Sequence, residues 1–509
     1  MERPDHAPKE EATSLTMGSV GVDFDLPGQF VLCDQVHPPW AGWLSYPCGE
    51  LFFHAHKLLP VRRLVDTGGE AVGLAAGWLI TQEGSLTLED LTLPPGVSFD
   101  DTERLEDWIY GFGGRFIFIV AGKGPARLYV DAGATLGTVF SPAQRRVGST
   151  VTALLWDQPG HPLWSRGLGV FPDDRPNQYY PAGITVDPGM HRLLPNHYLD
   201  LRTWQAVRHY PVHAPHPIRP KDTPLVADEI AHLVRRQVSA IVAAAPRTYV
   251  PLTGGRDSRT LLACSVGLHD RMEYVTFDCG RTGAPTGSSV DLTLSKEIAR
   301  VLGLKHNVLR VPKQVPPTIS LEYLCRIGFA GGSGKARDFY FSCQDHLDLS
   351  AAWIPGFGGE AWRASYWRDQ DHRASAAAPE QLLDRLGLPV TDFFCAAMRE
   401  WLEGLPADLP LTTVLELVYI EHRLGCWASP HLYGAAPFQM NLAPLCHRRI
   451  FELVLSLPLA YKQERLNRTI VSTRLPVLDN IPFNRYPGFG GLRHSAVQRI
   501  RRALKQRRH

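Results

Sequence analysis

The sequence predicts an α/β protein made of an α/β sandwich followed by a doubly wound parallel sheet. Residues 250–311 alternate buried strands with helices, the order that builds a parallel sheet covered by helices. Residues 112–140 contain two apolar strands joined by a turn, a pattern that suits a sandwich of sheets. Four prolines between residues 211 and 220 interrupt regular structure between these two halves.

The chain of 509 residues is long enough for two cores. We expect a disordered tail at 1–16, the sandwich at 17–208, a proline-rich linker at 209–224, the parallel-sheet half at 225–485 and a basic tail at 486–509. Thr223-Pro224 begins a predicted helix that runs toward Ala245, because proline is favoured in a first helical turn. The basic tail has a thin apolar stripe, and we interpret it as a solvated segment without an assigned function.

Composition excludes several classes of protein without selecting one. The net charge of +2 gives no general argument for a nucleic-acid or membrane partner. The nine cysteines include no CxxC pair, so neither a zinc site nor a disulfide framework is indicated. No apolar run approaches the roughly 18 residues of a spanning helix, and the charged start of the chain does not resemble a signal peptide. We therefore expect a cytoplasmic protein, and its oligomeric state is not indicated.

The most informative segment is 250–262, an apolar strand that runs into a glycine turn and then a helix. Gly254 and Gly255 can take backbone angles closed to other residues, which would let consecutive amides converge on an anion. The start of the helix adds the positive end of its dipole. Ser258 supplies a short hydroxyl donor, and Asp257 supplies a hard oxygen ligand of the kind that Mg²⁺ prefers. The alternative is an ordinary glycine turn before a helix.

Further elements follow the glycine turn in the order expected for the parallel sheet. Residues 273–277 form a predicted buried strand, because they are β-branched and aromatic. Residues 290–302 repeat apolar side chains at helical spacing and end at Gly303, and a short strand is predicted at 306–311. Ligands of such sheets lie at the carboxyl ends of the strands, where the glycine turn falls.

A second glycine loop, at residues 353–363, again joins an apolar stretch to a predicted helix. Glu360 in this loop is the second candidate ligand for Mg²⁺, although a solvated glutamate at a helix start is the alternative. Two glycine loops with one acid each, on the same predicted sheet, favour a shared metal. Residues 331–336 look like a Walker P-loop but fail the motif at Phe329 and Ala336, so we interpret them as a loop bordering the substrate pocket.

The segment 252–258 resembles the Ser-Gly-Gly-x-Asp-Ser pyrophosphate loop of the N-type ATP pyrophosphatases, and among them of the asparagine synthetase family. Thr253 stands for the usual serine, and Arg259 stands where a second serine is common. The family's aspartate at the start of the second helix and its Leu-Gly-x-x-His are matched by Asp291 and residues 302–306. Its Gly-x-Gly-x-Asp-Glu motif is similar to residues 356–361, with Glu360 on the first acid.

The resemblance implies ATP and Mg²⁺ as cofactors and assigns residues to them. Nucleotide-binding positions are Leu252, Thr253, Gly254, Gly255, Asp257, Ser258, Phe277, Gly358 and Gly359. Catalytic roles are assigned to Asp257, Glu360 and Arg256, and the metal ligands are Asp257 and Glu360. Arg259, Arg363 and Lys335 are candidate cationic helpers, because positioning and charge stabilisation dominate such transfers.

The first half resembles the class II glutamine amidotransferase domain of the same family, an N-terminal-nucleophile (Ntn) sandwich. Residues 112–120 match its Gly-Arg-Phe strand, and 127–140 approximate the Arg-Asp-x-x-Gly turn. Such glutaminases use an N-terminal cysteine whose own amine is the base. Here residue 2 is Glu2 and the first cysteine is Cys33, at the end of an apolar strand. We therefore expect a degenerate domain without glutaminase activity.

These resemblances imply an ATP-dependent ligase that adenylates a carboxylate, releases pyrophosphate and joins the acyl group to an amine whose source is not glutamine. Similar degenerate synthetases form β-lactams and peptide macrolactams, so the partners are a carboxylate substrate, an amine substrate or a precursor peptide. The alternatives are ammonia-dependent amidation of a small acid and a non-catalytic ATP-binding homologue. For the base, Tyr366 or Tyr419 with Glu421 are candidates, and Lys462 or Arg468 is the candidate for the family's late lysine.

Overall fold

The computed structural model of the chain describes most of the 509 residues. The described ranges are 26–98, 101–121, 126–166, 178–280, 289–332, 334–434, 438, 440–462 and 465–484. The predicted tails at 1–16 and 486–509 lie outside these ranges. The predicted α/β class is confirmed, because the structure combines helices with one parallel sheet and two sheets that are antiparallel except for a single strand pair.

The first half contains the two antiparallel sheets. One sheet has six strands in the order β12-β10-β11-β1-β3-β2. Its strands are β1 (Phe30–Cys33), β2 (Leu44–Cys48), β3 (Leu51–Ala55), β10 (Val139–Ser141), β11 (Arg146–Gly148) and β12 (His191–Arg192). The other has eight strands, in the order β14-β13-β9-β8-β5-β4-β7 with β6 paired to β5, and its β4–β7 pair is parallel. These are β4 (Val61–Val65), β5 (Ala71–Ile80), β6 (Leu86–Thr87), β7 (Leu91–Thr92), β8 (Gly113–Val120), β9 (Arg127–Val130), β13 (His197–Asp200) and β14 (Gln205–Arg208).

Strand β8 explains why this region of the sequence is so apolar. Ile117 and Ile119 pack with Phe30 of β1 in the core between the two sheets, whereas Phe116 and Phe118 belong to a different core on the outer face. All eight residues of the strand are buried. A strand covered on both faces has a continuous apolar run instead of an alternating pattern. The short helices of this half are α2 (Thr102–Tyr110), α3 (Val151–Leu154) and α4 (Pro162–Arg166).

The second half contains a five-stranded sheet in the order β17-β16-β15-β18-β19, and all of its strand pairs are parallel. The strands are β15 (Thr248–Pro251), β16 (Glu273–Asp278), β17 (His306–Arg310), β18 (Ala352–Trp353) and β19 (Met440–Asn441). Helices α5 (Thr223–Ala244), α6 (Arg256–Cys264) and α7 (Ser289–Leu302) confirm the predicted order of elements. The chain leaves β15 toward β16 and later returns to β18 on its other side, so the strand order reverses between β15 and β18. Ligands of open parallel sheets bind at such a point.

Further α-helices follow along the described part of the second half. They are α8 (Pro317–Arg326), α9 (Gly334–Gln344), α10 (Pro379–Leu386), α11 (Asp392–Glu403), α12 (Leu411–Leu417), α13 (Ser429–Gly434), α14 (Arg448–Ser456) and α15 (Arg465–Arg474). The helix predicted over 353–363 is a single 3-10 turn, η4 (Gly359–Trp362). Between α12 and α13 the chain forms an 11-residue π-helix, η6 (Val418–Ala428). π-Helical segments are rare, and those that occur are often found at functional sites.

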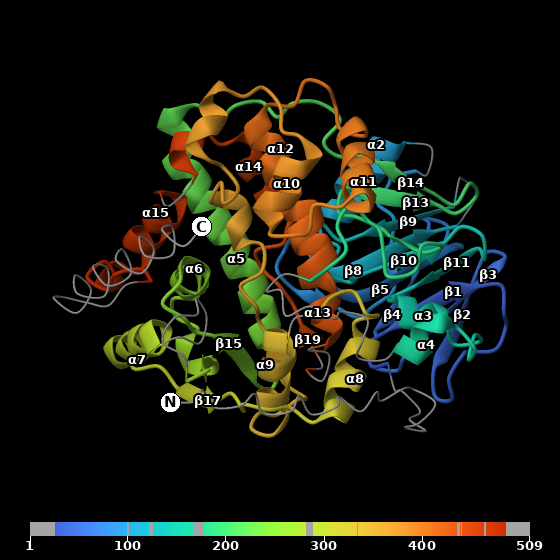
Figure 1. The fold of residues 1–509 in the computed structure, drawn as a ribbon, viewed down its shortest axis with the longest axis horizontal. Coiled ribbons are helices and arrows are strands. Elements are labelled where there is room, and N and C mark those ends of the chain that lie inside the picture. Colours follow the sequence, from blue (N-terminus) through green and yellow to red (C-terminus); the bar gives the residue numbers. More distant parts are fainter. Residues whose placement is uncertain are drawn as a thin grey trace, which may run out of the picture.

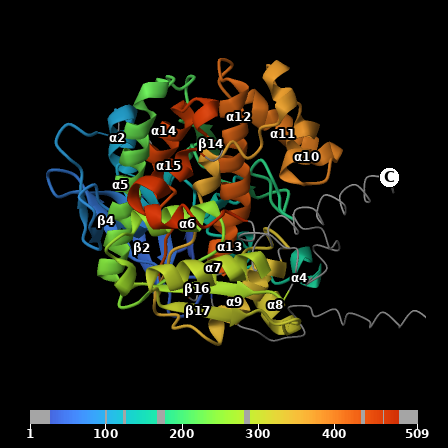
Figure 2. The same ribbon diagram turned by 90° about the vertical axis from the view of Figure 1, so that its left-hand side faces the viewer.

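The two halves lie side by side, with the antiparallel sheets on the right of Figure 1 and the parallel sheet at the lower left. Figure 2 shows α6 and α7 beside β16 and β17. One apolar core crosses the boundary, because Phe118 and Tyr129 of the first half cluster with Ile230 and Leu424 of the second. Within the described part of the chain, no helix combines the length and the apolar character that crossing a membrane requires.

Candidate active site

The point at which the strand order reverses holds two acids joined by one cation. Asp257 lies in the first turn of α6, directly after β15, and Glu360 lies in η4, after β18. Nη2 of Arg363 is 2.6 Å from Oε1 of Glu360 and 3.4 Å from Oδ2 of Asp257. The structure thus brings together two acids that the sequence separates by about a hundred residues.

Close backbone approach explains the glycines of both loops. A Cβ atom on Gly359 would lie 2.5 Å from Oδ1 of Asp257, and one on Gly254 would lie 2.5 Å from Cδ1 of Leu294 in α7. Gly358 has a φ of +98°, and its Cβ would meet the backbone of Leu445 at 3.0 Å. Glycine is therefore required at these positions for packing against the acid and its neighbours.

The glycine loop after β15 is held by its own hydrogen bonds. The N–H of Gly254 donates to Oδ1 of Asp291 at 2.7 Å, and the N–H of Gly255 donates to Oγ1 of Thr253 at 3.0 Å. The side-chain hydroxyls of Thr253 and Ser258 form a hydrogen bond of 3.0 Å. These glycine amides are engaged within the protein, and no described side chain caps the first turn of α6. An anion would therefore meet the dipole and first-turn amides of α6.

Asp257 lies in an environment that disfavours its ionised form. Burial raises its pKa to about 6 and the neighbouring Glu360 adds to this, while Arg363 and Arg256 act in the opposite direction. Its Oδ1 is buried and has no hydrogen-bond partner among the described residues. An unpartnered carboxylate oxygen beside a second acid suits a hard divalent cation, which takes one or two carboxylates and completes its shell with phosphates and water. No cluster of three or more metal-ligating side chains occurs in the ranges that the structure describes.

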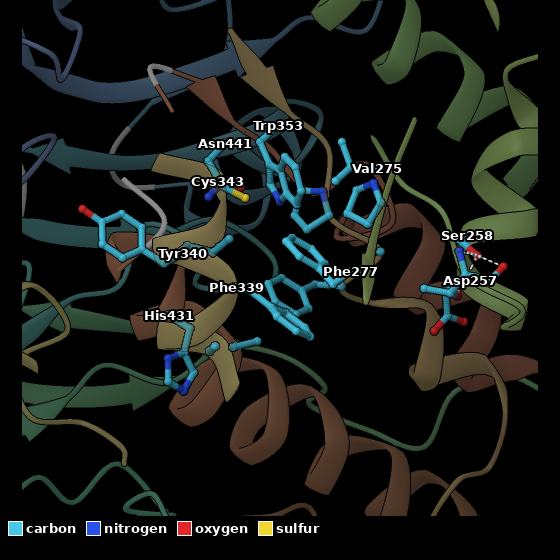
Figure 3. Close-up of a pocket in the computed structure, with 18 of the residues that line it drawn as sticks. Asp257, Ser258, Val275, Phe277, Phe339, Tyr340, Cys343, Trp353, His431 and Asn441 are labelled. Atoms are coloured by element: carbon cyan, nitrogen blue, oxygen red, sulfur yellow. Dashed lines mark hydrogen bonds between the residues drawn. The ribbon is translucent and has the colours of Figure 1, made fainter. Parts of the chain in front are cut away.

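The two acids line a cavity of about 410 Å³. In Figure 3, Asp257 and Ser258 lie at one end of this cavity, and aromatic rings fill its middle. Phe277 stacks on Phe339 with ring centroids 4.2 Å apart and an interplanar angle of 5°. Trp353 likewise stacks on Phe438 at 5.0 Å. The cavity therefore combines a charged end with a flat apolar wall, which suits a ligand that has both a charged group and a planar or apolar one.

The π-helix forms another wall of the cavity. Tyr419, Arg423 and Trp427 recur at every fourth position and all line it. The hydroxyl of Tyr419 accepts a hydrogen bond from the N–H of Gly358 at 3.3 Å, and the guanidinium of Arg423 lies 3.7 Å from the ring centroid of Trp427. Tyr419 thus links the π-helix directly to the loop that carries Glu360.

Three arginines predicted near the phosphates lie apart from this cavity. Arg256 and Arg468 line a separate cavity of about 270 Å³ with Phe483. Arg259 is fully buried and donates to the carbonyl oxygens of Ile481, Pro482 and Gly254, while its guanidinium lies 4.3 Å from the ring of Phe483. Arg259 therefore holds the late segment against the glycine loop. Of the predicted cations, all of which fall within the described ranges, Arg363 is the one that contacts both acids.

The structure does not bring Glu421 to the cavity. Its carboxylate is fully buried and accepts both Nη atoms of Arg208 at 2.7 Å, Nδ2 of Asn196 at 2.8 Å and Nε1 of Trp401 at 2.7 Å. Burial raises the pKa of Glu421, but Arg208 and the hydrogen bonds outweigh this and lower it to about 2. The hypothesis of a Tyr–Glu base pair at this residue is therefore wrong. The second candidate tyrosine, Tyr366, is not among the residues lining the cavity.

Lys462 and Lys335 also have partners away from the two acids. Lys462 is buried and pairs with Glu416, whose pKa burial raises to about 7 although Lys462 acts to lower it. Lys335 lies 5.5 Å from the ring centroid of Phe339, and the adjacent Ala336 lines the cavity. Residues 334–336 begin helix α9, at a place where the sequence predicts a loop.

Sequence reasoning missed most of the aromatic wall, including Phe339, Trp353, Phe438, Trp427 and His431. These side chains come from separate elements, and no local pattern distinguishes them from core residues. The four-residue spacing of Tyr419, Arg423 and Trp427 is a signal that the sequence did contain. Comparison of the chain with protein-family models and with curated proteins found no match in either case.

Proposed function

We propose that the chain is an ATP-dependent ligase that adenylates a substrate carboxylate and transfers the acyl group to an amine. The observation that carries this proposal is the pair of acids, Asp257 and Glu360, joined by Arg363 in one cavity at the carboxyl ends of β15 and β18. The resemblance of both loops to asparagine synthetase motifs supports an arrangement of the ATP pyrophosphatase type, preceded by an Ntn-like sandwich.

In the first step, an oxygen of the substrate carboxylate attacks the α-phosphorus of ATP. The bond from that phosphorus to the bridging oxygen breaks, and pyrophosphate leaves with the bonding electrons. In the second step, the amine nitrogen attacks the acyl carbon, the carbon–oxygen bond to AMP breaks, and the amine loses a proton. The first-turn amides of α6 and the guanidinium of Arg363 favour the negative charge on the departing diphosphate.

Mg²⁺ is the cofactor that the two acids fit. Asp257, with its unpartnered Oδ1, and Glu360 would hold the ion. When bound, Mg²⁺ would neutralise phosphate charge. Arg363 holds the two carboxylates close together, and Gly359 leaves room for the oxygen of Asp257 that faces it. These residues therefore keep two like charges adjacent without a metal.

Glutamine is not the source of the amine in this proposal. Cys33 is fully buried within β1, where it pairs with Phe52 of β3, and burial raises the pKa of its thiol. A buried thiol that follows a peptide bond and has a raised pKa has little thiolate and no free α-amine. The aromatic wall beside the acids supports a substrate larger than a small acid, such as a precursor peptide that is closed into a macrolactam.

Exchange of radiolabelled pyrophosphate into ATP tests the proposal. We expect exchange with a cognate carboxylate and Mg²⁺, and its loss in Asp257→Asn and in Glu360→Gln. A matched control is Asp90→Asn, at an exposed acid in the connection between β6 and β7, which should retain wild-type exchange. If product forms only when free ammonia is added, and not from an amine carried by the substrate, the result would support the amidation alternative. Wild-type protein that binds ATP but exchanges no pyrophosphate with any acid or peptide would contradict the ligase proposal in favour of a non-catalytic homologue.

A further inference from the structure

A second cavity lies between the two halves of the chain and shares no lining residue with the first. It has a volume of about 370 Å³, which is in the range of small-molecule sites. Its walls come from α2 and the end of β14 in the first half, and from α5 and α14 in the second. Its lining includes Glu106, Tyr110, His209, Tyr210, Arg448 and Glu452.

Arg448 at the start of α14 is a buried cation that forms no ion pair within 4.0 Å with a described acid, although the charges of Glu106 and Glu452 act on it from a longer distance. Its side chain is 6% exposed, and its guanidinium lies between two rings, 4.1 Å from the centroid of Tyr110 and 4.3 Å from that of Tyr210. Its Nε and Nη2 atoms are buried without a hydrogen-bond partner, and no described carboxylate forms an ion pair with it. Leaving a buried guanidinium without acceptors is costly. The arrangement therefore favours an anion in this cavity.

The two unpartnered nitrogens define what kind of anion fits. Nε and Nη2 form one edge of the guanidinium, a fork whose two N–H groups match the two oxygens of a carboxylate. The tyrosine rings on either side restrict the motion of this fork through cation–π contacts. A preorganised donor pair binds an anion with a smaller loss of side-chain entropy.

The acids around the fork define the rest of the ligand. Oε1 of Glu106 is buried without a partner, and its Oε2 lies 3.2 Å from Nδ1 of His209. Burial raises the pKa of Glu106 to about 7, although Arg448 acts against this, and burial lowers the pKa of His209 well below its usual range. Glu452 and Asp107 line the same cavity. These acids disfavour a doubly charged phosphate and favour an ammonium group.

We propose that this cavity binds a free amino acid, with its carboxylate on the fork of Arg448 and its ammonium group toward Glu106. Such a ligand satisfies both unpartnered groups at once and balances their charges. Because Glu106 lies on the first half and Arg448 on the second, the bound amino acid contacts both halves of the chain.

Isothermal titration calorimetry of the full-length protein with each common amino acid tests this proposal, with acetate and inorganic phosphate as reference ligands. We expect one or more amino acids to bind to one site per chain. Arg448→Lys keeps the charge but removes the fork, so affinity should fall by at least about tenfold. Arg300→Lys, at an exposed arginine of α7 that pairs with Glu297 and does not line this cavity, is the matched control and should bind as the wild type does.

A second variant keeps the test informative if Arg448→Lys does not fold, as judged by circular dichroism. Glu106→Gln should lower the affinity for amino acids by about tenfold and leave the affinity for acetate unchanged, because only the partner of the ammonium group is lost. Asp257→Asn should not change amino-acid affinity, which separates this site from the first cavity. The proposal is overturned if no amino acid binds, if phosphate binds in preference, if folded Arg448→Lys binds as the wild type does, or if Asp257→Asn abolishes binding.

Discussion

Gly359 and Asp257 are so close that a methyl group on the glycine would lie 2.5 Å from Oδ1 of the acid. This Oδ1 is the buried carboxylate oxygen that has no hydrogen-bond partner among the described residues. The carboxylate of Asp257 therefore occupies space that a side chain at position 359 would fill. The relation joins the loops after β15 and β18 at a single contact. The position of the acid therefore depends on the absence of a side chain on the neighbouring loop.

Gly359→Ala tests this relation. The added methyl group displaces the carboxylate of Asp257, so we expect pyrophosphate exchange to fall by at least about tenfold, in line with the effect of small misplacements in active sites. Gly356→Ala is the matched control, because its Cβ would meet the Cβ of Asp257 at an ordinary 3.4 Å. Equal exchange rates in the two variants would contradict this role for Gly359.

The pKa of Asp257 predicts a pH dependence of both stability and activity. Burial raises this pKa from 3.8 to about 6, so between these values the folded protein binds more protons than the unfolded chain. The contribution of Asp257 to the free energy of unfolding is therefore present below pH 3.8 and is lost as pH rises through about 6. Pyrophosphate exchange should instead rise as the pH increases, because Asp257 then becomes ionised.

Urea unfolding between pH 4 and 8 checks the stability part of this prediction. Asp257→Asn should remove the pH-dependent loss and be more stable at pH 7 by on the order of 1 kcal/mol. Asp90→Asn should act in the opposite direction, because hydrogen bonds from Arg63 lower the pKa of Asp90. A variant at Asp257 that keeps the wild-type pH profile would show that another group titrates there.

The buried pair of Arg208 and Glu421 predicts a large effect at the contact between the halves. Arg208→Met leaves Glu421 with no cation, so we expect the free energy of unfolding to fall by about 3–5 kcal/mol. Arg63→Met breaks an exposed pair with Asp90, whose side chains are 67% and 41% exposed, and should cost less than about 1 kcal/mol. Similar losses in the two variants, measured by urea unfolding, would rule out a special role of the buried pair.

Variants of Lys462 test whether this residue stabilises the fold or takes part in the reaction. Lys462→Met should destabilise the protein by about 3–5 kcal/mol, because Glu416 is then buried alone. The double variant Lys462→Met, Glu416→Leu removes both charges and should recover most of this loss. We expect the double variant to retain pyrophosphate exchange, since Lys462 pairs away from the cavity. Full stability with no exchange would instead assign Lys462 a role at the phosphates.

The fold was predictable where local patterns decide it. The strands at β15, β16 and β17 and the helices α5 and α7 have apolar spacing, caps and turn residues that identify them. Strands β18 and β19 have only two residues each, and their place beside β15 depends on pairing between distant segments. The π-helix was also beyond sequence reasoning, because its side chains repeat much as those of an α-helix do.

The candidate site was predictable in part for the same reason. Asp257 and Glu360 each follow a glycine turn, and parallel strands end at one edge of a sheet, so their proximity follows from local signals. The roles of Glu421 and Arg259 were not predictable. Arg208 and the segment around Ile481, which bind them, are distant in sequence, and no local pattern shows which charged residue finds a buried partner.

The core shared by Phe118, Tyr129, Ile230 and Leu424 has a consequence for any attempt to divide the protein. Cleavage at the proline-rich segment and separation of the fragments would expose apolar surface on both of them. We therefore expect each fragment to aggregate unless the other is present. The first half thus supplies part of the apolar core against which the second half packs.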